Sequence, residues 1–228
     1  MAAFAQAIEQ AAAFPALRAL IVTGAGGTFI SGGDLADLHN NPSEDAPHRQ
    51  NALMGGALAA LEALPIPTIA AIDGAARGGG CEVMLACDLR VLAADATMGF
   101  FQIRMAVTPG WDGAGRLLRL VGYARAMDVL TTGRVMDAEE ALRLGLADRI
   151  APPGEALQAA LAVAEAIAAM PPLAVRGVKT VLRAHLERSP ADALGEERAI
   201  FAQLWANEDH AEAVRAFLAK RPPQFAGK

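Results

Sequence analysis

Glu82 is the residue whose surroundings in the sequence most strongly suggest chemistry. It lies in the segment GAARGGGCEVMLACD, residues 74–88, where three consecutive glycines run into an apolar helical pattern. Glycines let a ligand or another backbone approach closely, and the start of a helix offers unpaired N–H groups with partial positive charge. The segment therefore fits an anion site, and it equally fits a tight strand-to-helix turn with a structural role.

A second glycine corner, SGGD at residues 31–34, has the same setting between a predicted strand and a predicted helix. One N–H from each corner could converge on a single oxygen atom. Two such donors aimed at a developing negative charge form an oxyanion hole, and a carboxylate beside it, Glu82, could move a proton. The alternative is a pair of structural turns with a glutamate on the surface.

Other glycine-rich or nucleophilic motifs fail on spacing. IVTGAGGTF lacks the third glycine of a dinucleotide-binding loop, because Phe29 stands there, and the chain has neither a G-x-S-x-G elbow nor a phosphate-binding G-x-x-x-x-G-K-[ST] loop. Tyr123 has Met127 four residues later, where a short-chain dehydrogenase needs lysine. The four histidines have no metal-ligand spacing, so no metal site is expected.

Composition narrows the class of protein. The net charge of −5 argues against general binding of nucleic acid, and the longest apolar stretches are interrupted by charges, so no membrane span is expected. The start MAAFAQAIEQ has no cationic region of a secretion signal. Two cysteines are too few for a disulfide framework. We therefore expect a reducing, cytoplasmic location.

The elements that must position these residues follow from the periodicity of apolar side chains. We expect a helix over 3–13, strands over 18–24, 65–74 and 88–100, a helix start at Asp34, a mobile polar loop over 39–51 and a helix from about Gly80. Helices are expected over 113–121, 123–131, 137–144, 155–169, 172–187 and 190–219. The pattern predicts an α/β fold, with a core over 1–135 and a helical region over 136–228.

Three segments closely resemble the enoyl-CoA hydratase/isomerase (crotonase) family: RALIVTGAGGTFISGGDL, PIPTIAAIDGAARGGGCEVMLACDLRVL and TGRVMDAEEALRLGLADRI. The ending EDHAEAVRAFLAKRPPQF also resembles that family, so the similarity extends from about Leu17 to the C-terminus. The resemblance implies a crotonase-like spiral of ββα units with a C-terminal helical region that trimerises, giving a homotrimer or hexamer. It also implies an acyl-CoA substrate and no separate cofactor.

The resemblance further implies roles for individual residues. Gly33 and Gly79 match the two oxyanion-hole donors, and Glu82 matches one of the two glutamates of a hydratase. Positions that in the family contact coenzyme A are matched by Ser31, Asp34, Leu35, Phe201 and Lys220.

The sequence also departs from the family pattern. Gln102 stands where the second hydratase glutamate is expected, and an amide cannot exchange a proton as a carboxyl group does. Asp112, a second candidate carboxylate or a helix N-cap, replaces a glycine, and Trp111 beside it is expected to shape the acyl pocket. The two strands that usually precede the first helix are missing from the sequence.

Three functions remain open on this basis. The first is hydration or isomerisation of a 2-enoyl-CoA with Glu82 as proton carrier. The second is decarboxylation of a malonyl-type acyl-CoA, which forms the same enolate without a base. The third is a CoA-binding trimer that has lost activity.

Overall fold

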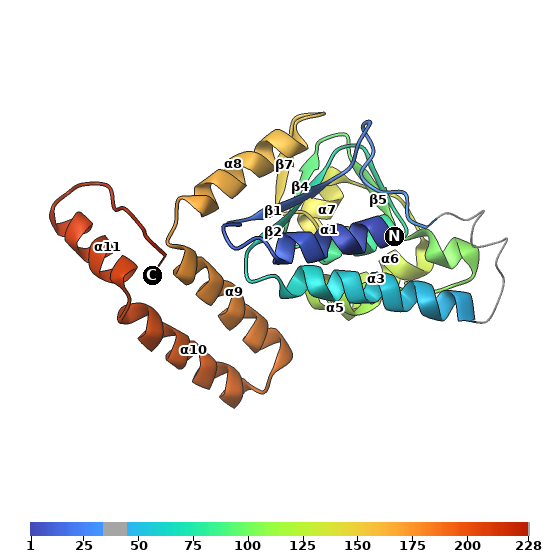
Figure 1. Ribbon diagram of the computed structural model, residues 1–228. Helices are drawn as coiled ribbons and strands as arrows, with labels where there is room; N and C mark the ends of the chain where they lie inside the picture. Colours follow the sequence, from blue (N-terminus) through green and yellow to red (C-terminus); the bar gives the residue numbers. More distant parts are fainter. Residues whose placement is uncertain (34–44, 228) are drawn as a thin grey trace.

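The computed structural model describes residues 1–33 and 45–227, which form two small sheets and the helices around them (Figure 1). The first half contains α1 (Ala2–Ala12), β1 (Leu20–Thr23), α3 (Asp45–Ala63), β2 (Thr68–Ile72), β3 (Ala75–Arg77), α4 (Gly79–Leu85), β4 (Leu89–Ala93), β5 (Thr97–Gly99) and the 3-10 helix η1 (Phe101–Met105). The second half contains α5 (Gly113–Val121), α6 (Tyr123–Thr132), β6 (Met136–Asp137), α7 (Ala138–Leu144), β7 (Arg149–Ala151), α8 (Ala156–Ala168), α9 (Pro172–Glu187), α10 (Pro190–Trp205) and α11 (Glu208–Leu218). The prediction of an α/β fold is confirmed.

The larger sheet has the strand order β1-β2-β4-β7, and all of its neighbouring strands are parallel. Every residue of β2 is buried, as expected for a parallel strand covered on both faces. Helix α8 packs across β1, β2 and β4. Strands β1 and β2 of this sheet precede the two glycine corners in the chain.

The smaller sheet, of order β3-β5-β6, brings the two corners together. Phe29 N–H donates to the carbonyl oxygen of Ala75 at 3.0 Å, and Arg77 N–H donates to that of Ile30 at 3.0 Å. The segment that leads into the SGGD corner therefore runs parallel to β3, which leads into the glycines before α4. Hydrogen bonds between main chains thus fix the relative position of two segments that lie far apart in the sequence.

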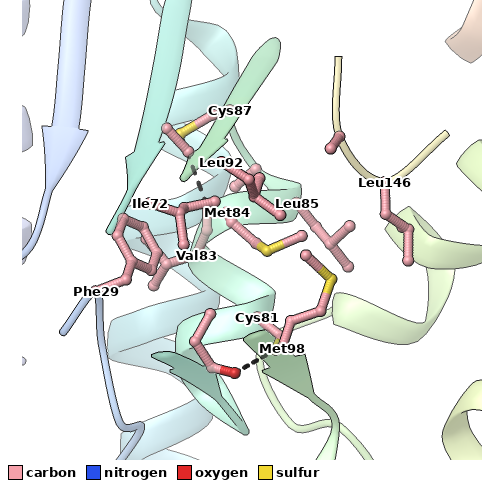
Figure 2. Close-up of a cluster of buried hydrophobic side chains, with 14 of the residues drawn as sticks. Phe29, Ile72, Cys81, Val83, Met84, Leu85, Cys87, Leu92, Met98 and Leu146 are labelled. Carbon is pink, nitrogen blue, oxygen red and sulfur yellow. Dashed lines mark hydrogen bonds between the residues drawn. The ribbon is translucent and has the colours of Figure 1, made fainter. Parts of the chain in front are cut away.

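Helix α4 lies in the centre of the hydrophobic core, where its side chains meet both sheets (Figure 2). Cys81 and Cys87 are free thiols in this core, and burial raises the pKa of each to about 12. Both cysteines therefore act as small apolar side chains, without the thiolate that reactivity requires.

The C-terminal helices leave the core as an arm, in which α10 lies against α9 (Figure 1). The arm is anchored by Lys179 of α9, whose ammonium lies 2.6 Å from the Asp88 carboxylate and 2.9 Å from the carbonyl oxygen of Ile66. Large apolar side chains stay exposed along it, at Phe201, Trp205, Phe217 and Leu218. Of the helices described, none alone has the length and apolar character to cross a membrane; α8 and α9 meet that test only as a pair, bent by 108°.

Several expectations about individual elements are wrong. Residues 45–51 belong to helix α3, whereas a loop was expected over 39–51. The helix forms because Met54, Leu58 and Leu61 recur on one buried face. The helix expected over 190–219 is interrupted at Asn207, whose side chain accepts from His210 N–H and caps α11.

The sequence prediction also missed three short strands, β3, β6 and β7. The latter two lie beyond residue 135, yet they pair with β5 and β4 of the core. The helix start expected at Asp34 lies outside the described residues.

Candidate active site

Glu82 is a buried carboxylate held by three N–H groups. It lies in the first turn of α4 with 2% of its surface exposed. One of its oxygens, Oε2, accepts from the backbone N–H groups of Trp111 at 2.8 Å and Gly113 at 2.9 Å. The other, Oε1, accepts from the amide of Gln102 at 2.9 Å. Since Oε1 has one such partner, it keeps a lone pair with which to accept a proton.

The turn before α5 is shaped to receive this carboxylate. Asp112, between the two backbone donors, is in the left-handed conformation with φ 63°. A left-handed residue next to right-handed ones lets neighbouring N–H groups converge on an anion. A Cβ atom added to Gly113 would lie 2.5 Å from Cγ of Glu82 and 2.6 Å from its Oε2, so only glycine leaves room for the side chain.

The environment of Glu82 shifts its titration in the direction that favours a general base. Burial raises the pKa of the carboxyl above its ordinary value of 4.5, and the N–H donors of Trp111, Gly113 and Gln102 oppose this effect without cancelling it. A carboxylate with a raised pKa is a stronger base once it is ionised.

Gln102 belongs to the 3-10 helix η1, just beyond the strand expected over 88–100. Its Nε2 donates to Glu82, while its Oε1 is buried and has no hydrogen-bond partner among the described residues. A buried acceptor without a hydrogen bond costs free energy. This oxygen is therefore available to accept a hydrogen bond from a water molecule or a substrate hydroxyl.

The two glycine corners meet beside α4. A Cβ atom added to Gly32, the neighbour of Gly33, would lie 3.1 Å from the backbone nitrogen of Gly79. Gly79 is the first residue of α4, so its N–H has no acceptor within the helix. A side chain at Gly79 would overlap the six-membered ring of Trp111, which packs directly on this glycine.

Trp111 and Asp112 point in different directions from the same turn. The Trp111 indole is 7% exposed, and its carbonyl oxygen accepts from the buried Arg116 guanidinium at 2.5 Å. The Asp112 carboxylate faces α3, since its Oδ2 would be 3.2 Å from a Cβ atom on Gly55. Asp112 occupies the N-cap position of α5, but its side chain makes no capping hydrogen bond.

The residues expected to contact coenzyme A are dispersed. Ser31, the first residue of the SGGD corner, is exposed, and Asp34 and Leu35 lie outside the described residues. Phe201 on α10 and Lys220 after α11 are exposed on the C-terminal arm (Figure 1). No group of three metal-ligating side chains occurs among residues 1–33 and 45–227.

Two cavities lie near the core. One, of about 300 Å³, is a groove bounded by η1, α5 and α6 that includes Gln102. The other, of about 420 Å³, lies between the core and α9 and includes Cys87, Asp88 and Lys179. The first contains the side chain that donates to Glu82, whereas the second approaches the site through Arg116, which donates to the carbonyl oxygen of Trp111.

Sequence reasoning missed the backbone groups that hold Glu82. Gly113 has no reactive side chain, and its role depends on a contact with a residue 31 positions earlier. The available signal was the P-G-x-x-G spacing from Pro109 to Gly113, which marks a turn before a helix.

Comparison with known proteins gives a consistent result. Residues 1–228 match the family described as enoyl-CoA hydratase/isomerase. The chain is 39% identical over 211 residues to the "Probable enoyl-CoA hydratase echA8" of Mycobacterium bovis, covering 92% of this chain and 81% of that protein. It is 36% identical over 215 residues to the "Crotonyl-CoA hydratase" of Syntrophomonas wolfei, covering 94% of this chain and 82% of that one.

Solved structures agree in fold. A crystal structure of enoyl-CoA hydratase from Bacillus anthracis superposes with a TM-score of 0.94 at 32% identity, covering 99% of this chain and 88% of the other. A second, from Polaromonas sp. JS666, gives 0.92 at 31% identity, with 98% and 88% coverage. The expected crotonase-like core is thereby confirmed.

Proposed function

The chain belongs to the enoyl-CoA hydratase/isomerase family and is an acyl-CoA enzyme of that type; we propose that it adds water to the C2–C3 double bond of a 2-enoyl-CoA. The observation that carries the proposal is the buried Glu82 carboxylate, held by Gln102 and the turn at Trp111 and Gly113, beside the N-terminal glycine of α4. This arrangement supplies a base and a hydrogen-bond donor within one site.

In the proposed reaction, the thioester oxygen accepts hydrogen bonds from the N–H groups of Gly33 and Gly79. Water is held between Glu82 and the unpaired Oε1 of Gln102. Glu82 takes a proton from the water, whose oxygen bonds to C3 as the C2–C3 π electrons move onto the thioester. The resulting enolate is stabilised by the two N–H groups. Glu82 then returns the proton to C2, so one water is added and the carboxylate is regenerated.

Gln102 has a positioning role in this scheme. Its amide orients the carboxylate through Nε2 and the water through Oε1, and neither contact transfers a proton. A single carboxylate must then act first as base and then as acid. The enzyme should therefore hydrate more slowly than one that uses two carboxyl groups.

The same scheme extends to the binding of coenzyme A and to assembly. Ser31, Asp34 and Leu35 would contact the adenine and pantetheine portions, and Phe201 and Lys220 would hold the nucleotide end. In the single chain the last two lie on the arm, so we assign them to the site of a neighbouring protomer in a homotrimer or a hexamer. No separate cofactor is needed, because the thioester itself accepts the developing charge.

Two substrates test the proposal. Purified protein incubated with crotonyl-CoA should consume the enone absorbance, while methylmalonyl-CoA should release no CO2. CO2 release without hydration would establish the decarboxylase alternative, which needs no base. Binding of both thioesters without turnover of either would establish an inactive CoA-binding protein.

A further inference from the structure

Arg116 of α5 is a buried arginine that connects the turn around Glu82 with helix α3. Its side chain is 5% exposed. Nη1 donates to the carbonyl oxygen of Trp111 at 2.5 Å, and Nη2 lies 2.6 Å from Oε2 of Glu62, in the last turn of α3. The planar guanidinium therefore spans two acceptors on different elements, a geometry that the single ammonium of lysine does not reproduce.

The carbonyl group that Arg116 holds lies between the two backbone groups that hold Glu82. The N–H groups of Trp111 and Gly113 donate to Oε2 of Glu82 at 2.8 Å and 2.9 Å. The peptide unit between them joins the carbonyl of Trp111 to the nitrogen of Asp112, and its oxygen faces Arg116. Because the three peptide units are consecutive, the direction of the middle carbonyl constrains the directions of the two N–H groups.

The conformation of this turn needs support from its surroundings. Asp112 has φ 63°, in the left-handed region, which costs free energy for a residue other than glycine. A residue in such a conformation persists where its neighbours hold it. The Asp112 side chain makes no capping hydrogen bond, so it does not hold the turn itself. The contact from Arg116 fixes the peptide unit whose rotation sets this φ.

We propose that Arg116 is a positioning residue for hydration, which keeps the turn from Trp111 to Gly113 in the conformation that presents both N–H groups to Glu82. The inference rests on the proposed function, because it takes Glu82 as the base. Arg116 acts through the main chain, and it has no hydrogen bond to Glu82 among the described residues.

The proposal has a consequence for the titration of Glu82. The N–H donors of the turn oppose the effect of burial, which raises the pKa of the carboxyl. If the turn loosens, these hydrogen bonds weaken and the pKa of Glu82 rises further. A residue that merely stabilised the fold would leave this pKa unchanged.

Other charged side chains on the elements around Glu82 do not contact it. None of them forms a hydrogen bond or an ion pair with Glu82 within residues 1–33 and 45–227; they are Arg77, Arg104, Asp112 and Arg119. Arg77 donates to oxygens of β3 and β5, and the Asp112 carboxylate faces α3. Cys81, next to Glu82 in α4, remains a thiol because burial raises its pKa to about 12.

Arg90 supplies a matched control. It is 4% exposed, its Nη1 donates to the carbonyl oxygen of Cys87 at 2.9 Å, and its Nη2 lies 3.0 Å from the Asp148 carboxylate. Like Arg116, it therefore bridges a carbonyl and a carboxylate, and Nε of each has no partner among the described residues. Replacing either arginine removes a buried ion pair, but only Arg116 contacts the turn that holds Glu82.

The experiment compares Arg116→Met, Arg116→Lys and Arg90→Met in the pH–rate profile of crotonyl-CoA hydration. Arg116→Met should lower kcat by about 10²-fold, the cost of a small displacement of a catalytic group, with little change in KM. Its acid limb should move to higher pH. Arg116→Lys keeps the charge but reaches one acceptor, so it should show the same changes to a smaller extent, and it carries the test if the methionine variant does not fold. Arg90→Met should lose stability and keep the wild-type kcat and midpoint.

Two outcomes of the kinetics would overturn the proposal. One is a wild-type midpoint in a folded Arg116→Met protein. The other is a wild-type profile in Arg116→Lys beside a shifted one in Arg116→Met, which would assign the effect to charge rather than to the geometry of the turn.

A titration without substrate separates this proposal from the proposed function. Infrared spectroscopy follows the band of the protonated Glu82 carboxyl, identified by its absence in Glu82→Gln. The midpoint of this band should move to higher pH in Arg116→Met and stay in place in Arg90→Met. The expected shift in a protein that hydrates no enoyl thioester would contradict the proposed function alone. An unshifted band in a protein that hydrates crotonyl-CoA would overturn the role of Arg116 and leave the proposed function standing.

Discussion

At the scale of the residue, the pKa of Glu82 is the property that connects burial with catalysis. The carboxyl must be ionised to take a proton from water, and burial raises its pKa above 4.5. We therefore expect kcat/KM for hydration to fall as the pH is lowered, with a midpoint above 4.5. The measurement is a pH–rate profile with crotonyl-CoA, accompanied by circular dichroism to show that the fold persists. A midpoint at or below the ordinary value would contradict a desolvated base.

The same shift has a consequence for stability. An acid with a raised pKa in the folded state stabilises the protein fully below its unfolded pKa, and this contribution is lost as the pH rises through the folded value. Glutamine does not titrate, so the free energy of unfolding of Glu82→Gln lacks this decrease. The difference in that free energy, variant minus wild type, should therefore be larger at pH 7 than at pH 4. Denaturant unfolding at both pH values provides the check. The replacement amide can be accommodated, because Gln102 can rotate its unpaired Oε1 toward it.

Gln102 offers a prediction in the opposite direction. Gln102→Glu places a second carboxyl group 2.9 Å from the first, and the pair then holds one proton between them. One group can act as acid while the other acts as base, so the rate of crotonyl-CoA hydration should increase by ~10²–10⁴-fold, the range of general acid–base assistance. Gln102→Met keeps the length of the side chain and removes both the hydrogen bond to Glu82 and the proposed acceptor for the water, so it should decrease the rate. No increase in a folded Gln102→Glu protein would mean that position 102 does not face the reacting carbons.

At the scale of the element, helix α5 contains two glycines with different surroundings. Gly113 lies against Glu82, and Gly115 does not. Gly113→Ala would place a methyl group 2.5 Å from Cγ of Glu82 and displace the carboxylate. A small displacement of a catalytic group can cost about 10²-fold, and we expect a loss of kcat of that order. Gly115→Ala is the matched control, since its Cβ atom would meet only the end of the Arg119 side chain, at 3.9 Å.

The control has its own expected result. Alanine is a better helix former than glycine, so Gly115→Ala should raise the free energy of unfolding by about 0.5–1 kcal/mol with kcat unchanged. Both variants would be measured by crotonyl-CoA hydration and by thermal unfolding. Equal kcat in the two variants would show that the turn before α5 does not position Glu82.

The elements also show how far the sequence alone could be read. Strands β2 and β4 and helices α5, α8 and α9 were predictable, because each has a continuous apolar run or a clear helical period. Strands β3, β6 and β7 are at most three residues long and depend on pairing with distant segments, which leaves no local pattern. Helix α3 was missed because its polar first turns resemble a loop, and its apolar face starts only at Met54.

The candidate site divides in the same way. Glu82 and Gly79 could be singled out as candidates, because three consecutive glycines and a carboxylate stand together at the start of an apolar helical pattern. The turn at Trp111 and Gly113 was missed, because the P-G-x-x-G spacing from Pro109 to Gly113 marks a turn but does not show that its N–H groups bind a carboxylate 31 positions earlier. Asp112 was a candidate by residue type alone, and its carboxylate faces Gly55 of α3.

At the scale of the whole molecule, the exposed side chains of the C-terminal arm suggest assembly. Phe217 is 83% and Leu218 75% exposed, and exposed apolar clusters of this kind mark interaction surfaces. We predict a sedimentation mass of three or six times 23.6 kDa. Phe217→Asp combined with Leu218→Asp should shift the protein toward the monomer. Leu142→Asp on α7 is the control, and a monomeric wild-type protein would contradict the predicted assembly.

The central claim is that Glu82 is the one proton carrier in the hydration of a 2-enoyl thioester. It is tested most directly by incubating crotonyl-CoA with wild-type protein and with Glu82→Gln in D2O and following the product by NMR. The account predicts that the wild-type protein forms 3-hydroxybutyryl-CoA with one deuterium at C2, and that Glu82→Gln lowers this rate by about 10²–10⁴-fold while still binding the thioester. Equal rates of deuterium incorporation in the two proteins would contradict it.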